Sequence, residues 1–190
     1  MTSKTASLQV LLSAAALILG ACGKPDQVSL LGIQPGMALD EVKTAAPAGT
    51  SLYCLGDGDT AFEQVAGLPQ STTLKFCTWS TVGAQTKRNV AQLQVGEASS
   101  LGQKLAFGYS EGKYTLNVFY IEFPVTAYDK VVASMTEQLG KPNASSNLPV
   151  LNEAVQWEAQ NGSLRASKED SVSQPPSTLL LLKKADAPRT

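Results

Sequence analysis

Two patterns of apolar residues alternate along the chain and predict two kinds of element. Helical spacing occurs in 39–46 and in 126–139, where Tyr128, Val131 and Met135 lie on one face of the second segment. Apolar and polar residues alternate with a period of two elsewhere, which predicts strands at 74–79, 90–95, 104–109, 114–123, 155–160, 163–168 and 179–182. The predicted order is therefore helix, four strands, helix, three strands.

The ends of these segments carry local signals. Ala38 stands at the cap position of the first helix, where a side-chain hydroxyl would normally accept a hydrogen bond. Thr126 followed by Asp129 predicts a capping box for the second helix, and Gly140 is typical of a helix end. Asn161-Gly162 between two alternating segments predicts a tight β-hairpin.

Together these elements predict an α+β fold, an antiparallel sheet with helices on one face. The order also fits two tandem units, each a helix followed by a β-meander. Aromatic residues on both faces of 114–123 favour a strand at the centre of a covered sheet, and the leucine run at 179–182 favours a strand inside a sheet. We expect one α+β domain over 30–184 and a frayed tail at 185–190.

The N-terminus has the three-part pattern of a secretory signal, with Lys4, an apolar run over 8–19 and small residues before Cys22. The run is too short to span a bilayer as a helix. Leu19-Gly20-Ala21-Cys22 resembles the lipobox of bacterial lipoproteins, which implies a signal peptide over 1–21 and acyl chains, palmitate among them, on Cys22. The alternative is ordinary signal-peptidase cleavage, which leaves Cys22 unmodified.

Residues 22–29 then form a short tether that keeps the domain within about 25 Å of the membrane surface. Gly23 follows the lipidated cysteine, and in the sorting pattern of enteric bacteria this implies the outer membrane. We therefore expect a lipid-anchored protein on the periplasmic side of the outer membrane.

Composition excludes several function classes. The 190-residue chain has a net charge of −1, so we expect no nucleic-acid partner. It contains no histidine, which argues against Ser-His-Asp and Cys-His catalysis and against the commonest zinc sites. We expect a protein that is not an enzyme and that needs no cofactor, metal or small-molecule substrate.

Two cysteines remain once Cys22 is set aside. Cys54 and Cys77 form an even pair in an exported chain, which predicts a disulfide rather than two free thiols. The long segment between them is the best candidate for partner binding, through its acidic and aromatic residues Asp57, Asp59, Phe62 and Glu63. The alternative is a solvated loop that the disulfide pins for stability.

Two further interpretations of this segment are weaker. Calcium binding would need a third oxygen ligand at Ala61, and this position lacks one. Asp57 and Asp59 could form an acid/base pair, but neighbouring loop acids are usually only solvated.

The segment Gly36-Met37-Ala38-Leu39-Asp40-Glu41-Val42 is similar to the G-M-[ST]-x-x-E-V opening of the SmpA/OmlA (BamE-like) outer-membrane lipoproteins. Related helix-plus-meander units are doubled in the β-lactamase inhibitor protein. The L-G-x-P helix end of the family occurs here only at 139–142, after the second helix. The resemblance implies a non-enzymatic fold used for protein–protein contact at the outer membrane.

The leading hypothesis is an envelope lipoprotein that acts as a protein-binding module and docks another envelope protein. An inhibitor or immunity protein that blocks a lytic or toxic envelope enzyme is the alternative. A carboxylate-dependent cell-wall hydrolase is the remote one.

Overall fold

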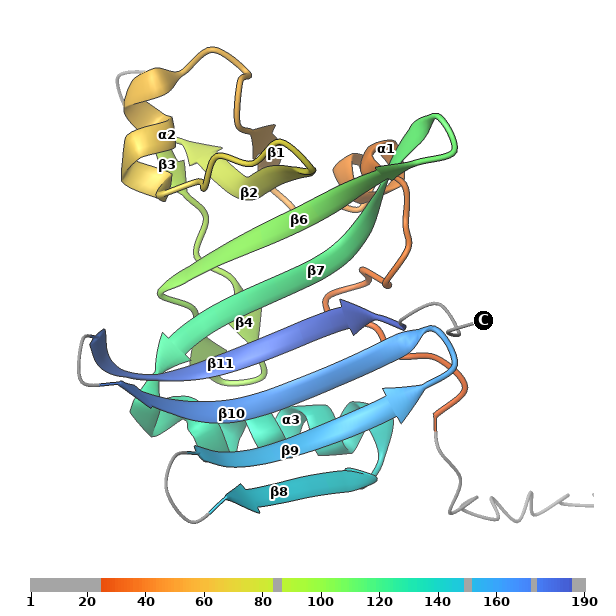
Figure 1. Cartoon of the computed structure of the whole chain (residues 1–190). Coiled ribbons are helices and arrows are strands. Elements are labelled where there is room, and N and C mark those ends of the chain that lie inside the picture. Colours follow the sequence, from red (N-terminus) through yellow and green to blue (C-terminus); the bar gives the residue numbers. More distant parts are fainter. Residues whose placement is uncertain (1–24, 84–86, 149–151, 172–173, 186–190) are drawn as a thin grey trace, which may run out of the picture.

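The computed structural model describes residues 25–83, 87–148, 152–171 and 174–185 (Figure 1). The predicted signal peptide, Cys22 and most of the predicted tail lie outside these ranges. In the described part of the chain, no helix is long and apolar enough to cross a membrane.

One antiparallel sheet dominates the fold, and its strand order is β1-β2-β6-β7-β11-β10-β9-β8, with β3 paired to the end of β2. The strands are β1 Ser51–Cys54, β2 Leu74–Val82, β3 Arg88–Val90, β6 Gly102–Ser110, β7 Lys113–Pro124, β8 Ala144–Leu148, β9 Asn152–Ala159, β10 Gly162–Ser171 and β11 Gln174–Lys184. A separate small ribbon pairs β4 Gln94–Val95 with β5 Ala98–Ser99. The predicted antiparallel α+β class is confirmed.

The strand order divides the sheet into two meanders. The first, β1-β2-β6-β7, follows helix α1 (Leu39–Thr44), and the second, β8-β9-β10-β11, follows helix α3 (Tyr128–Leu139). The last strands of the two meanders pair antiparallel, from Ser177 opposite Pro124 to Lys183 opposite Val118. The fold is thus a tandem of two helix-plus-meander units joined at the β7–β11 seam.

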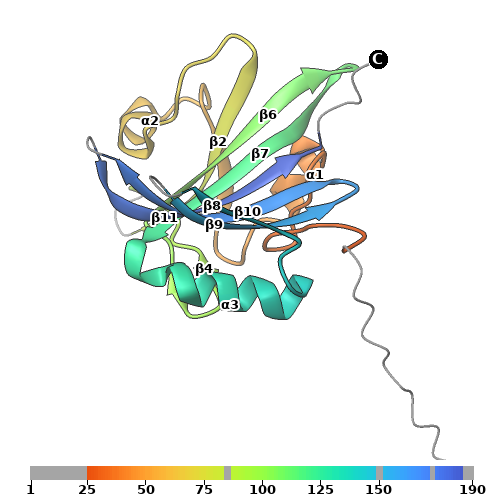
Figure 2. The same cartoon turned by 60° about the horizontal axis from the view of Figure 1, so that its bottom comes forward.

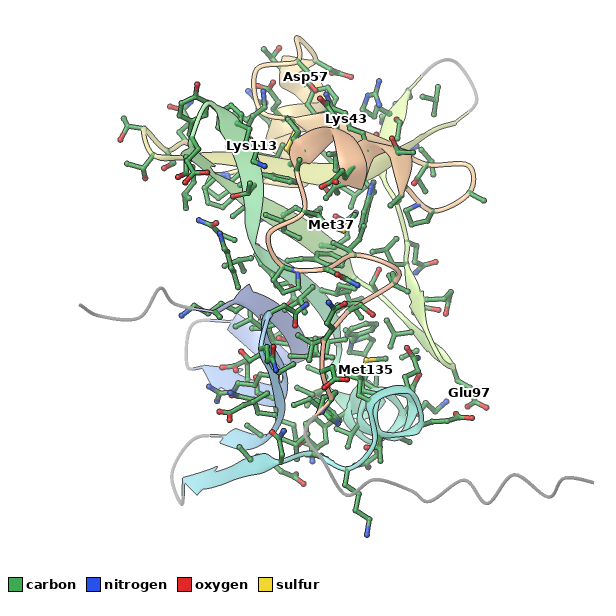
Figure 3. The ribbon with its side chains drawn as sticks, turned by 90° about the vertical axis from the view of Figure 1, so that its right-hand side faces the viewer. Met37, Lys43, Asp57, Glu97, Lys113 and Met135 are labelled. Carbon is green, nitrogen blue, oxygen red and sulfur yellow. A yellow bond between two sulfur atoms is a disulfide. The ribbon has the colours of Figure 1, made fainter. Side chains whose placement is uncertain are left out.

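The main core lies between the sheet and helices α1 and α3, which occupy the same side of the strands (Figure 3). Val42 on α1 and Val131 and Met135 on α3 are buried against the strands. Trp79 and Phe119 meet edge to face in this core, with ring centroids 5.1 Å apart. These contacts are of the kind that contribute most to the stability of such a layered fold.

A third helix, α2 (Thr60–Ala66), lies on the opposite side of the sheet from α3 (Figure 2). It packs Phe62 into a second, smaller cluster with Tyr53 and Leu68, which also contacts Phe76 of β2. Neighbouring residues of a strand point to opposite faces, so Phe76 belongs to one face and the buried Cys77 to the other. The two predicted helices, α1 and α3, thus share one face as the sequence predicts, and α2, which the sequence pattern does not predict, lies on the other.

Several boundaries differ from the prediction. The strand predicted at 90–95 is wrong, because the chain forms only the end of β3 and the two-residue β4 there. The capping box predicted at Thr126 does not form, because a 3-10 turn over Val125–Ala127 runs directly into α3. At α1 the missing cap of Ala38 is offset by Glu41, whose carboxylate accepts the Ala38 N–H at 2.6 Å.

The side chain of Gln103 extends the contact between β2 and β6 where their backbones part. The paired positions end at Cys77 opposite Leu105. Beyond them, buried Gln103 donates from Nε2 to the Trp79 carbonyl at 2.9 Å and accepts the Trp79 N–H at 3.2 Å. It also accepts a hydrogen bond from the Thr78 hydroxyl at 2.8 Å. One side chain thus satisfies polar groups that burial would otherwise leave unpaired.

The N-terminal segment joins the domain before residue 30. Val28 is fully buried, and its backbone N–H donates to Oδ1 of Asn161 at 2.8 Å while its carbonyl accepts from Nδ2 at 3.0 Å. Asn161 lies in the predicted β9–β10 hairpin, which forms. A Cβ at Gly162 in that hairpin would clash with the Lys183 carbonyl, so the close approach of β11 requires glycine.

Candidate functional site

The Cys54–Cys77 disulfide forms, as predicted, and joins two residues that are directly opposite each other in β1 and β2. Both cysteines are buried. The bridge therefore closes the base of the 55–76 segment and is not itself a contact surface.

The three predicted acidic binding residues of this segment hold the segment together. Asp57 accepts the Cys54 N–H at 2.8 Å, and Asp59 caps α2 by accepting the Phe62 N–H at 3.0 Å. Glu63 accepts from the Tyr53 hydroxyl at 3.0 Å and from the Gly56 N–H at 2.9 Å. Their carboxylates thus have structural partners, which fits the alternative of a loop pinned for stability.

Phe62, the predicted aromatic contact, is 3% exposed and packs edge to face against Tyr53, with centroids 5.0 Å apart. The Arg88 guanidinium covers both rings, 5.0 Å from the Tyr53 centroid and 5.8 Å from that of Phe62. Arg88 also donates to Ser80 Oγ at 2.7 Å. Burial raises the pKa of the Tyr53 hydroxyl. The hydrogen bond that it accepts from the Asp59 N–H lowers this pKa, and the neighbouring Glu63 carboxylate raises it.

The surface that the structure leaves uncovered is the other face of the sheet, over β6, β7, β11, β10 and β9. We call it the open face. It faces the viewer in Figure 1, with α3 behind the strands. On each strand its residues alternate with fully buried ones such as Phe119, Leu180 and Leu164, which point toward the helices.

The strand register arranges the open face in rows that cross the sheet. The central row consists of Lys104, Tyr120, Leu181, Arg165 and Gln156, one residue from each of five neighbouring strands. The two flanking rows contain several small side chains, namely Gly102, Ser167 and Ala154 on one side and Ala106 and Ser163 on the other.

Three of these small residues, Ser163, Ala106 and Gly102, line hollows beside the central row. A groove of about 640 Å³ lies over β9, β10 and β11 and is lined by Arg165, Leu181 and Lys183. A second hollow of about 400 Å³ is lined by Val118 and Ala106 among others. The open face is therefore recessed, with an apolar and aromatic centre.

A third hollow of about 190 Å³ separates the open face from α2 and is lined by Lys104, Tyr120 and Glu122. Two exposed apolar residues border it, Val65 of α2 at 72% exposure and Leu101, just before β6, at 64%. The disulfide-closed segment thus contributes to the exposed surface through Val65 and Ala66.

The sequence contained a signal for this face. Tyr120 and Val118 share β7 with Phe119 and Ile121, and residues 179–182 are all leucine, so both faces of these strands are apolar. The pattern of 114–123 predicts a sheet covered on both sides, and this prediction is wrong, whereas the leucine run of β11 lies inside the sheet as predicted, between β7 and β10. Helices α1 and α3 cover one side, α2 packs on the other side only near β1, β2 and β3, and the apolar residues of β7 and β11 on that side remain partly exposed.

The described residues offer little for metal binding, since they contain no group of three or more His, Cys, Asp or Glu side chains placed to hold an ion. The comparisons with known proteins identify no relative, since no family model, curated protein or solved structure matches the chain.

Proposed function

We propose that the protein is a lipid-anchored, periplasm-facing module that docks another envelope protein on its open face. The observation that supports this most directly is the central row, where Tyr120 and Leu181 lie side by side on a surface that neither α1 nor α3 covers. Contiguous apolar surface with a polar rim is typical of protein interaction sites. Tyrosine and arginine are also enriched among residues that dominate binding energy.

The N-terminal segment supports an orientation close to the membrane. Pro25 and Asp26 line the groove of about 640 Å³, and the backbone of Val28 is held by the Asn161 side chain. With Cys22 as the lipidated residue, only residues 22–27 separate the acyl chains from the folded domain, a span of about 20 Å at most. The partner would therefore meet the open face near the membrane surface.

Site-specific photocrosslinking in the native envelope tests this proposal. A photoreactive amino acid replaces Leu181 on the open face or, as a matched control, Glu137 on the exposed side of α3. We expect one protein to crosslink from position 181 and not from position 137, and a Tyr120→Arg substitution to abolish that crosslink.

The identity of the crosslinked protein distinguishes the two binding roles. A subunit of an envelope assembly supports a docking role, and a single lytic enzyme supports the inhibitor role. Equal crosslinking from positions 181 and 137, or none from 181, would contradict the proposal.

A further inference from the structure

Four consecutive residues of the central row have a cation at each end and apolar side chains in the middle, and Gln156 follows them on β9. Lys104 is paired with Tyr120, Tyr120 with Leu181, and Leu181 with Arg165. The row thus runs cation, aromatic, aliphatic, cation across β6, β7, β11 and β10.

Lys104 is held in place without a carboxylate. Its ammonium lies 5.9 Å from the centroid of the Tyr120 ring. Gly67 is the C-terminal cap of α2, and a Cβ built on it would lie 3.6 Å from Nζ of Lys104. The Lys104 ammonium therefore lies beside the C-terminal end of α2. The aromatic ring and the helix end both favour a positive charge at this position.

Arg165 occupies the corresponding place at the other end of this four-residue stretch. Within the described ranges, neither Arg165 nor Lys104 forms an ion pair with a carboxylate. Glu122 and Glu158 of the open face belong to the flanking rows, and Asp26 lines the groove that Arg165 also lines. A half-buried guanidinium is best satisfied by a carboxylate that binds it through two hydrogen bonds.

The spacing of the row specifies its ligand. Three steps between neighbouring strands, each about 4.8 Å, separate the backbones at Lys104 and Arg165 by about 14 Å. In an extended segment, residues i and i+4 are about 13 Å apart, and residues i, i+2 and i+4 point to the same side. An acidic residue, an apolar residue and an acidic residue at these positions would reach Lys104, the Tyr120–Leu181 pair and Arg165.

We infer that the partner docks through an extended segment of the pattern acid-x-apolar-x-acid, which lies across the strands along the central row. This inference rests on the proposed function and names the recognition chemistry of the same face. The recess beside the row favours a protein segment over a flat bilayer, which would not reach its floor.

Fluorescence anisotropy with labelled nine-residue peptides tests the inference on the mature lipidated protein in detergent micelles. The first peptide has Glu at its third and seventh positions and Leu at its fifth. A second has Lys in place of both Glu residues, and a third has the composition of the first with Glu at the third and fifth positions and Leu at the seventh. We expect the first peptide to bind about tenfold more tightly than either control, which corresponds to about 1.4 kcal/mol.

Charge reversal on the protein provides the matched variants. Arg165→Glu and Lys104→Glu each remove the preference for the first peptide, and the double variant prefers the lysine peptide. Lys141→Glu, which makes the same charge change at an exposed position after α3, leaves the preference unchanged. Arg165→Gln and a melting curve of each variant separate loss of binding from loss of folding.

The outcomes separate this inference from the proposed function. Equal binding of the three peptides, or no binding, overturns the inference, while a specific crosslink from Leu181 would leave the proposed function standing. Sedimentation with phosphatidylglycerol vesicles, tested with the Cys22→Ser chain, supplies the other check. If the vesicles bind the chain through Arg165 and Lys104 and the peptides do not bind, a membrane is the occupant and the inference is wrong.

Discussion

The disulfide between β1 and β2 allows a quantitative prediction. Cys54 and Cys77 are separated by 23 positions, and a bridge over this length restricts the unfolded chain by about 3 kcal/mol in the chain-entropy description. The Cys54→Ala/Cys77→Ala variant should therefore lose about 3 kcal/mol of the free energy of unfolding, measured by guanidinium denaturation of the oxidised protein and the variant.

The structure also predicts where the loss appears first. The cluster of Tyr53, Phe62 and Leu68 is separate from the main core, and the bridge closes the chain segment that contains α2. Amide hydrogen exchange in α2 should accelerate more than exchange in α3. A loss below about 1 kcal/mol would refute the chain-entropy argument, and equal acceleration in both helices would refute the assignment of α2 to a separate cooperative unit.

Three further predictions follow from side chains that hold the fold. Gln103→Leu leaves the Trp79 backbone groups without this partner and should lower the free energy of unfolding by about 2–4 kcal/mol in denaturant titrations; a loss under about 0.5 kcal/mol would contradict the bridging role. Asp59→Ala removes the cap of α2 and should cost about 1 kcal/mol, whereas Asp59→Asn retains the cap and should cost less in the same assay. The raised pKa of Tyr53 means that its contribution to stability is complete below pH 10 and is lost as the pH rises through the folded-state pKa. Melting temperatures above pH 10 should therefore fall more steeply for the parent chain than for Tyr53→Phe, and parallel curves would exclude this residue as the cause.

The long strands and the last hairpin were predictable because their signals are local. Strand β7 alternates between buried and partly exposed residues over most of its length. The β9–β10 hairpin forms where the Asn161-Gly162 signal predicts it, with Gln160 and Asn161 in the turn and Gly162 already paired with Ala159. Helix α2 was missed although it has recognisable end signals, a capping Asp59 and a left-handed Gly67. Its seven residues are too few for a clear helical period, and β1 and β8 are likewise short terminal strands of the sheet.

The candidate site was harder to predict because it depends on which face of the sheet the helices cover, and the pattern of apolar residues in the sequence does not show this. A strand with apolar residues on both faces has the same sequence pattern whether helices cover both faces of the sheet or only one. Only the tertiary arrangement shows that α1 and α3 cover the side of Phe119 and leave the side of Tyr120 open. The acidic residues of the 55–76 segment were conspicuous in the sequence, but their hydrogen bonds lie within the segment.

The β7–β11 seam gives the central row an approximate dyad. β6 and β7 of the first unit correspond to β10 and β11 of the second, so Lys104 corresponds to Arg165 and Tyr120 to Leu181. The acid-x-apolar-x-acid pattern that fits such a row is the same in both chain directions, so a docked segment can bind in either direction. Each unit contributes one half of the row, so the row exists only where the two units pair along the β7–β11 seam.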